Sequence, residues 1–169
     1  YVLRKKPPGQ LLASAHAVER EFKIMKALSG TPVPVPEMYH LCEDPDVIGQ
    51  VFFVMEHIEG RVFSDRLLGA CSRPERSAIY DDMNRVLSAL HQLDYQAIEL
   101  DGFGRPDGYI DRQISRWSKQ YHATKMIDLV EMDNIIMWLS DNNPESDETS
   151  IAHGDYRLGN LIVLPDQPK

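Results

Sequence analysis

The sequence predicts an α+β fold with a small strand-rich N-terminal part followed by a helical part. Short apolar runs of β-branched and aromatic type lie mainly within residues 1–60, and such runs are typical of strands. Apolar residues spaced three and four apart dominate residues 61–169, which indicates amphipathic helices. Gly60 follows the last apolar run of the first part. We therefore expect two lobes, residues 1–60 and 61–169, with a hinge near residues 56–62.

The boundaries of the elements follow from local signals. Ser14 is of N-cap type and Gly30 of stop type, so a helix is expected from residue 14 to about residue 29. Pro74 marks a helix start. Further apolar stripes predict helices that contain residues 110–121 and 129–139, and strands are expected at residues 1–3, 38–42, 51–57 and 161–164.

Composition excludes several classes of protein. The 169 residues carry a net charge of -8, which disfavours nucleic acid and anionic membranes as partners. No apolar run approaches the roughly 20 residues that an integral membrane segment needs. Two cysteines without metal-type spacing favour a reduced, intracellular protein, although one disulfide is arithmetically allowed. The residues do not distinguish cytoplasm, mitochondrion and peroxisome.

Both ends of the chain read as cuts in a larger protein. The sequence opens on Tyr1 in a strand-like run and stops at Lys169, directly after the apolar run at residues 161–164. We therefore expect a fold that is truncated at both ends.

The strongest motif spans residues 153–160, His-Gly-Asp-Tyr-Arg-Leu-Gly-Asn. It fits H-x-D-x-x-x-x-N, the catalytic-loop pattern of kinases. In that chemistry Asp155 orients or deprotonates the attacking hydroxyl, and Asn160 is a Mg²⁺ ligand. A surface turn between strands also favours Gly, Asp and Asn, so the motif alone leaves that alternative open.

A second signal is a carboxylate on an apolar helix stripe. Glu21 lies in line with Val18, Met25 and Leu28, and an inward carboxylate needs a cation. The preceding strand supplies cations at residues 4–6, and a pair of this kind holds nucleotide phosphates in kinases. The alternative is an exposed ion pair at the rim of the stripe.

A third signal is the run from Val51 to Gly60, an apolar strand that passes into a polar stretch ending in glycine. In a two-lobed kinase such a strand leads into the hinge, where backbone near Glu56 to Ile58 reads the adenine edge. An ordinary core strand has the same pattern.

In this order, the motifs resemble the aminoglycoside-phosphotransferase and choline-kinase group. Val33-Pro34-Val35-Pro36, the hinge pattern from Phe52 to Gly60, and Gly154 inside the catalytic loop match that group. A closer resemblance is to phosphotransferase domains found upstream of acyl-CoA dehydrogenase modules. It rests on the long motif from Gly104 to Trp117, with shorter motifs at residues 2–4, 7–9, 17–21 and 90–94.

The resemblance implies a protein-kinase-like fold and an ATP- and Mg²⁺-dependent kinase acting on a hydroxyl group of a small metabolite. Asp155 and His153 would be catalytic, and Asn160 would bind the metal. The nucleotide would be held by Arg4, Glu21, Glu56 and Ile58. Arg4 stands where the family usually has Lys, which favours, as an alternative, a catalytically degenerate binding domain.

The resemblance also implies flanking parts and an acceptor. The glycine-rich phosphate loop and a second metal-binding Asp would lie outside residues 1–169, so we expect this fragment alone to be nearly inactive. Basic residues at positions 105, 112, 116 and 119 would suit a hydroxy-acid or hydroxyacyl-CoA, or would form structural ion pairs with the nearby aspartates. The parent protein could carry a fused acyl-CoA dehydrogenase module, with this chain as an accessory domain.

Overall fold

The computed structural model describes residues 1–7, 18–105, 107–143 and 148–165. Spatial contacts divide the chain into two compact units. The first comprises Tyr1–Leu100 and Ser150–Lys169, and the second comprises Asp101–Thr149. The predicted boundary between lobes at residue 60 stays a prediction.

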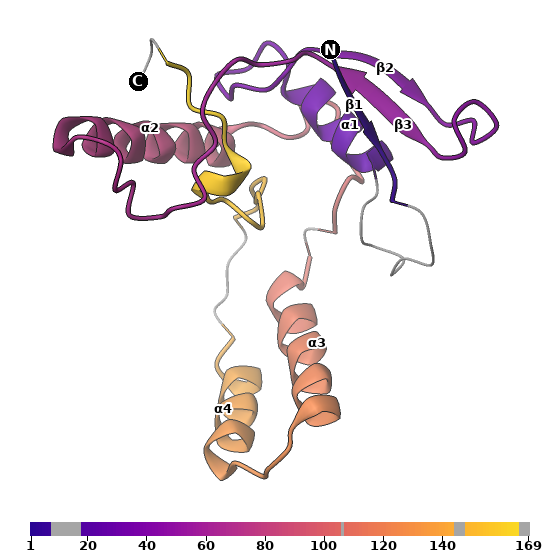
Figure 1. The fold of residues 1–169 in the computed structure, drawn as a ribbon. Helices are drawn as coiled ribbons and strands as arrows, with labels where there is room; N and C mark the ends of the chain where they lie inside the picture. Colours follow the sequence, from indigo (N-terminus) through magenta and orange to yellow (C-terminus); the bar gives the residue numbers. More distant parts are fainter. Residues whose placement is uncertain (8–17, 106, 144–147, 166–169) are drawn as a thin grey trace. The chain divides into compact units, whose positions relative to one another are not determined.

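A three-stranded antiparallel sheet forms the N-terminal part of the first unit (Figure 1). Its strands are β1 (Val2–Lys5), β2 (Met38–Cys42) and β3 (Phe52–Met55), in the order β1-β3-β2. The middle strand is the most apolar, and Phe53 is fully buried. All three predicted strands of this part are confirmed, although β3 is shorter than residues 51–57.

Helix α1 (Val18–Leu28) packs on this sheet through one stripe of side chains. Val18 is buried together with Met38 and Phe53, and Met25 lies against them. The period of three and four residues that predicted the helix therefore also selects the buried face. The expected N-cap at Ser14 lies outside the described residues.

Helix α2 (Arg73–Gln92) begins as its sequence predicts. Ser72 is the N-cap, its Oγ accepts a hydrogen bond from the Glu75 N–H at 3.4 Å, and Pro74 lies in the first turn. Near the end of the helix, Leu90 is buried against Leu28 and Val33, with Ile151 beside them. This cluster ties the end of α1 and the segment before the 153–160 motif to the same helix.

The segment after β3 passes very close to the end of the chain. Arg61 and Val163 form an isolated antiparallel bridge, with N···O distances of 2.8 and 2.9 Å. A Cβ at Gly60 would come within 2.9 Å of the Val163 carbonyl oxygen and closer still to Ile162, so only glycine fits at position 60. The prediction of a strand at 161–164 is wrong, because the structure has only the single Arg61–Val163 bridge there. One bridge does not make a β-ladder.

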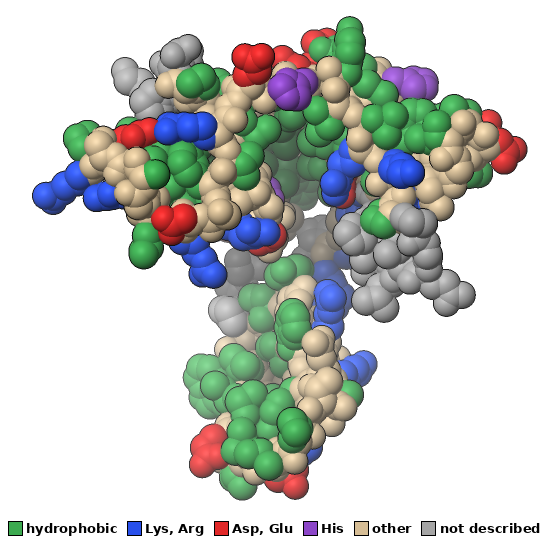
Figure 2. All heavy atoms as spheres, in the orientation of Figure 1, with side chains coloured by type: hydrophobic (Ala, Val, Ile, Leu, Met, Phe, Trp, Pro, Cys, Tyr) green, Lys and Arg blue, Asp and Glu red, His purple; other side chains and the backbone are tan. Residues whose placement is uncertain are grey.

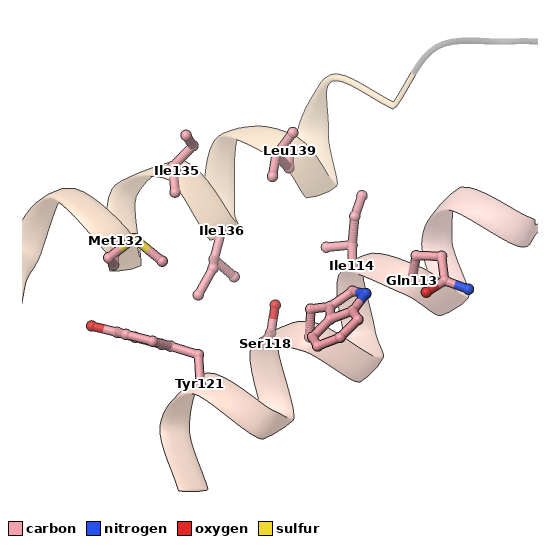
Figure 3. Close-up of a pocket in the computed structure, with 9 residues that line it drawn as sticks. Gln113, Ile114, Ser118, Tyr121, Met132, Ile135, Ile136 and Leu139 are labelled. Carbon is pink, nitrogen blue, oxygen red and sulfur yellow. The ribbon is translucent and has the colours of Figure 1, made fainter. Parts of the chain in front are cut away.

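The second unit contains α3 (Tyr109–Thr124) and α4 (Val130–Asp141), which pack against each other. Both predicted helices are confirmed. A groove of about 260 Å³ lies between them (Figure 3) and is lined by Gln113, Ile114, Trp117, Ser118, Tyr121, Met132, Ile135, Ile136 and Leu139. Neither helix has a buried residue. With one sheet and four α-helices among the described residues, the predicted α+β class is confirmed.

Candidate active site

The 153–160 loop is anchored to α2 through one apolar and one polar contact. Leu158, in the short 3₁₀ helix Leu158–Asn160, is buried in a cluster with Leu68 and Ile79. The Tyr156 hydroxyl donates a hydrogen bond of 2.8 Å to the Met83 carbonyl oxygen. These contacts hold the loop while its charged side chains remain at the surface.

Asp155 and Asn160 come together in this loop. The Asn160 Nδ2 donates to the Asp155 carboxylate at 2.7 Å and to the Asp155 carbonyl oxygen at 2.9 Å. Because the amide nitrogen is used in this way, the Oδ1 of Asn160 remains as its oxygen ligand for a cation. The two side chains of the motif are therefore in direct contact.

Arg157 is a site residue that the motif did not reveal. Its Nε lies 3.1 and 3.2 Å from the two carboxylate oxygens of Asp155. The signal in the sequence is only a cation two residues after the Asp, and Arg157 occupies one of the positions that the motif leaves open.

These two donors set the charge state of Asp155. The hydrogen bond from Asn160, followed by that from Arg157, lowers the pKa of Asp155 below its usual range. The carboxylate is 63% exposed, so the opposing effect of desolvation is smaller than that of either donor. Asp155 is therefore ionised at neutral pH, and it is better suited to orienting a hydroxyl than to removing a proton early in the reaction.

His153 and Gly154 shape the loop. The Nδ1 of His153 accepts a hydrogen bond of 3.3 Å from the Asp155 N–H, and its ring packs edge-on against Tyr156 at 5.5 Å. Gly154 has φ of 82°, in the left-handed region that side chains disfavour. In this structure His153 positions the Asp155 backbone.

Arg4 and Glu21 form the pair that the second signal predicted. The guanidinium of Arg4 donates two hydrogen bonds to the Glu21 carboxylate, of which the one from Nη2 is 2.8 Å long. This bond to Glu21 raises the pKa of Arg4. The side chains are 46% and 34% exposed, so the pair lies at the rim of the α1 stripe, and exposed pairs stabilise a fold by only about 0.2–1 kcal/mol.

The backbone after β3 is arranged unusually at Glu56. The Glu56 N–H donates to the Glu37 carbonyl at 2.8 Å, but the Glu37 N–H donates to the Glu56 side chain at 3.1 Å. The Glu56 carboxylate thus accepts the hydrogen bond from the Glu37 N–H. In a regular antiparallel ladder that N–H would bond to the Glu56 carbonyl oxygen. Within the described ranges, neither the Glu56 carbonyl nor the Ile58 N–H hydrogen-bonds to another residue.

The predicted site residues therefore form three local groups. His153, Asp155 and Asn160 lie in one loop, Arg4 pairs with Glu21, and Glu56 pairs with Glu37. Among the described residues, no hydrogen bond or ion pair joins one group to another. Their convergence on one nucleotide stays a prediction.

The 153–160 loop offers few protein ligands for a magnesium ion. Within the described part of the chain, no group of three His, Cys, Asp or Glu side chains could hold a metal. Mg²⁺ in phosphoryl transfer needs only one or two protein oxygen ligands, because water and phosphate complete its shell. Asn160 Oδ1 beside the Asp155 carboxylate fits that limited role.

The basic residues of the 104–119 region form few of the expected contacts. Arg112 donates to the backbone carbonyl oxygens of Arg105 and Asp107, and the Arg116 guanidinium lies 5.6 Å from the Trp117 ring centre. No ion pair with Asp101, Asp107 or Asp111 occurs between the described residues.

The cysteines and the helices bear on the class of protein to which the chain belongs. Cys42 and Cys71 are both free. In the described segments, no helix has the length and apolar character required to span a bilayer.

The comparisons with known proteins show the family and the fold. The sequence profile described as the phosphotransferase enzyme family matches residues 1–169. A crystal structure of a Ralstonia eutropha protein, assigned as an aminoglycoside phosphotransferase, superposes with a TM-score of 0.86 at 48% identity. The match covers 99% of this chain and 49% of that one. The predicted protein-kinase-like fold is therefore confirmed.

Curated relatives are larger proteins. The chain is 47% identical to mouse acyl-CoA dehydrogenase family member 10. The match covers 98% of the chain and 16% of the mouse protein. It is 46% identical to human acyl-CoA dehydrogenase family member 11, and 45% identical to the probable acyl-CoA dehydrogenase IBR3 of Arabidopsis thaliana, with 22% of each covered. The chain thus spans about a fifth of these relatives, and it belongs to the phosphotransferase enzyme family.

Proposed function

We propose that this chain contains the catalytic loop of an ATP-dependent kinase that phosphorylates a hydroxyl group of a small metabolite. The observation that carries the proposal is the convergence of Arg157 and Asn160 on the ionised carboxylate of Asp155. A structural turn has no need of an exposed carboxylate held by three hydrogen bonds, whereas a hydroxyl-orienting group must be held in one position.

In the proposed reaction, Asp155 accepts a hydrogen bond from the acceptor hydroxyl and aims its oxygen at the γ-phosphorus. The new O–P bond forms as the bond to the β-phosphate oxygen breaks, and the hydroxyl proton passes to Asp155. A low pKa suits this order of events, because phosphoryl transfer is largely dissociative and the proton is transferred late.

Asn160 would hold Mg²⁺ through its Oδ1, with the nucleotide phosphates as the other main ligands. The ion would neutralise phosphate charge. The chain's own contribution is to direct Oδ1 outward, because the amide nitrogen is already bonded to Asp155.

Arg4, Glu21 and the backbone at Glu56 and Ile58 would hold the nucleotide. Glu21 orients the guanidinium of Arg4 through two bonds, so the remaining donors of Arg4 could reach a phosphate. The Glu56 carbonyl and the Ile58 N–H, two residues apart, offer the acceptor and donor that the adenine edge requires.

For the acceptor, we propose a hydroxy-acid or its CoA thioester. Support comes from the names of the relatives, which are acyl-CoA dehydrogenase family proteins, and from Arg116, which bonds to no carboxylate among the described residues. The same relatives also favour a second candidate, an accessory domain within a larger acyl-CoA dehydrogenase.

The test is an ATP-consumption screen of the full-length protein over hydroxy-acids and their CoA esters. Asp155→Asn is the active-site control and Arg85→Gln is the matched surface control. We expect at least one hydroxyl substrate whose phosphorylation falls about 10²-fold or more in Asp155→Asn and is unchanged in Arg85→Gln. ATP that binds without turnover on any substrate would instead favour a degenerate or accessory domain.

A further inference from the structure

A basic hollow lies at the beginning of α2, and its lining residues are not those of the 153–160 loop. A pocket of about 460 Å³ is lined by Arg66, Leu67, Arg73, Arg76, Ser77 and Tyr80, and we call it the arginine pocket. Figure 2 shows Lys and Arg side chains gathered over this end of α2, at the left of the view. None of these residues belongs to the proposed kinase site.

The arginines of this pocket are not neutralised by the protein. Between the described residues, Arg66, Arg73 and Arg76 form no ion pair. Three acids adjoin the pocket in the sequence, and Asp81 accepts a hydrogen bond of 3.4 Å from the pocket residue Ser77. The other two have partners outside the pocket lining or in the backbone. Asp65 accepts hydrogen bonds from the Leu67 and Gly69 N–H groups at 2.9 Å, and Glu75 pairs with Arg61 at 2.6 Å. Three guanidinium groups that form no ion pair thus line one hollow, although the chain as a whole has a net charge of -8. Their positive charges repel one another unless an anion binds.

The pocket walls are held in place. The Tyr80 hydroxyl donates to the Arg66 carbonyl at 2.7 Å, and the Arg76 Nη1 donates to the Cys71 carbonyl at 2.8 Å. Both bonds tie the loop before α2 to the same face of the helix. The pocket therefore exists before any ligand arrives, which lowers the entropic cost of binding.

Backbone strain next to the pocket residue Leu67 also favours a functional role for this region. Leu68 has φ of 50° although it is not glycine, and it is buried beside Ile79 and Leu158. Its neighbour Leu67 is 82% exposed. The left-handed turn at Leu68 thus buries this leucine, while the preceding leucine, Leu67, is presented to solvent at the pocket. Strain of this kind persists where the surroundings enforce it and is concentrated at functional sites.

We propose that the arginine pocket binds a small organic phosphate that carries at least two phosphate groups. Guanidinium groups match phosphate oxygens in a bidentate fashion, and three of them call for a multiply charged anion. Leu67 and Tyr80 provide an apolar surface for the organic part of the ligand. The hollow is open to solvent, and its volume of about 460 Å³ leaves room for a small molecule.

The experiment is calorimetric titration of the full-length protein with inorganic pyrophosphate and with ADP. The variants are Arg66→Gln combined with Arg73→Gln, Arg85→Gln as an α2 control, and Asp155→Asn. The side chains of Arg66 and Arg73 are exposed and make no hydrogen bond to another described residue, so the double variant should fold normally, as a thermal melt will check.

ADP should also bind at the proposed nucleotide site of the kinase, so the pocket is followed with pyrophosphate. We expect one pyrophosphate-binding event that weakens roughly tenfold for each arginine removed, or about a hundredfold in the double variant. It should persist in Arg85→Gln and Asp155→Asn, and it should weaken as salt is raised. Unchanged binding in the double variant would overturn the proposal. An equal loss in Arg85→Gln, or equally tight binding of an oligoglutamate peptide, would also overturn it.

Discussion

At the scale of single residues, hydrogen bonds determine what Asp155 can do. Its carboxylate is exposed, so water alone would leave its pKa near the usual value of about 3.9. Asn160 and Arg157 lower that pKa by stabilising the charged form. The same two donors also prevent rotation of the carboxylate, so its charge and its orientation have one cause.

Replacement of Arg157 should therefore change the pH dependence of the reaction. The carboxylate form of Asp155 exists above its pKa, and removal of Arg157 raises that pKa toward about 3.9. We expect the acid limb of the kcat/KM profile of Arg157→Ala to move to higher pH, with Arg85→Ala as the unshifted control. An acid limb that stays in place would show that Asp155 is not the group titrating.

The Arg4–Glu21 pair should matter for nucleotide binding more than for stability. Because both side chains are partly exposed, Arg4→Ala should lower the free energy of unfolding by no more than about 1 kcal/mol. The KM for ATP should rise severalfold, and Arg4→Lys should recover part of the loss. Thermal unfolding and steady-state kinetics measure the two effects, and an unchanged KM would contradict the proposed phosphate role.

At the scale of elements, the catalytic loop depends on packing that is remote from its charges. Leu158 inserts into the cluster beside α2, while the Arg61–Val163 bridge closes the segment that follows. Gly60 makes this bridge sterically feasible. The loop is therefore held by α2 on one side and by the segment after β3 on the other.

Gly60→Ala should destabilise the protein by about 1–3 kcal/mol, the usual cost of forcing an extra group into a packed site. The new methyl group would meet Ile162 and the backbone of Val163. Gly104→Ala is the matched control, because nothing lies within 4 Å of a Cβ at position 104. Chemical denaturation measures both variants, and equal effects would argue against a specific contact at Gly60.

At the scale of the whole molecule, residues 1–169 correspond to about half of a solved relative and a fifth of the curated ones. Among the described residues, Asn160 and Asp155 are the candidate ligands for Mg²⁺, and no cluster of three ligands exists. A divalent ion held by so few protein groups is bound weakly.

We therefore expect the isolated 169-residue chain to transfer phosphate far more slowly than the full-length protein. A coupled ADP-release assay on both, at equal concentration and saturating Mg²⁺, measures the difference. Turnover of the isolated chain within about tenfold of an ordinary kinase rate of 1–100 s⁻¹ would contradict this expectation.

The sequence by itself determined the order of the elements and the place of the 153–160 motif between α4 and the end of the described chain. Local rules suffice for both, because helix periodicity, start signals such as Pro74, and the Asp155–Asn160 spacing act over a few residues. These rules predicted a strand at residues 161–164, where the structure has a single bridge, because strand formation depends on a partner far along the chain.

Only the tertiary structure showed that Arg157 faces Asp155, that the Glu56 side chain displaces its own carbonyl from the ladder, and that Arg66 joins Arg73 and Arg76 at one pocket. The physical reason is the same in each case. A side chain's direction depends on turns and on packing against residues that are distant in the sequence, and no local pattern records those contacts.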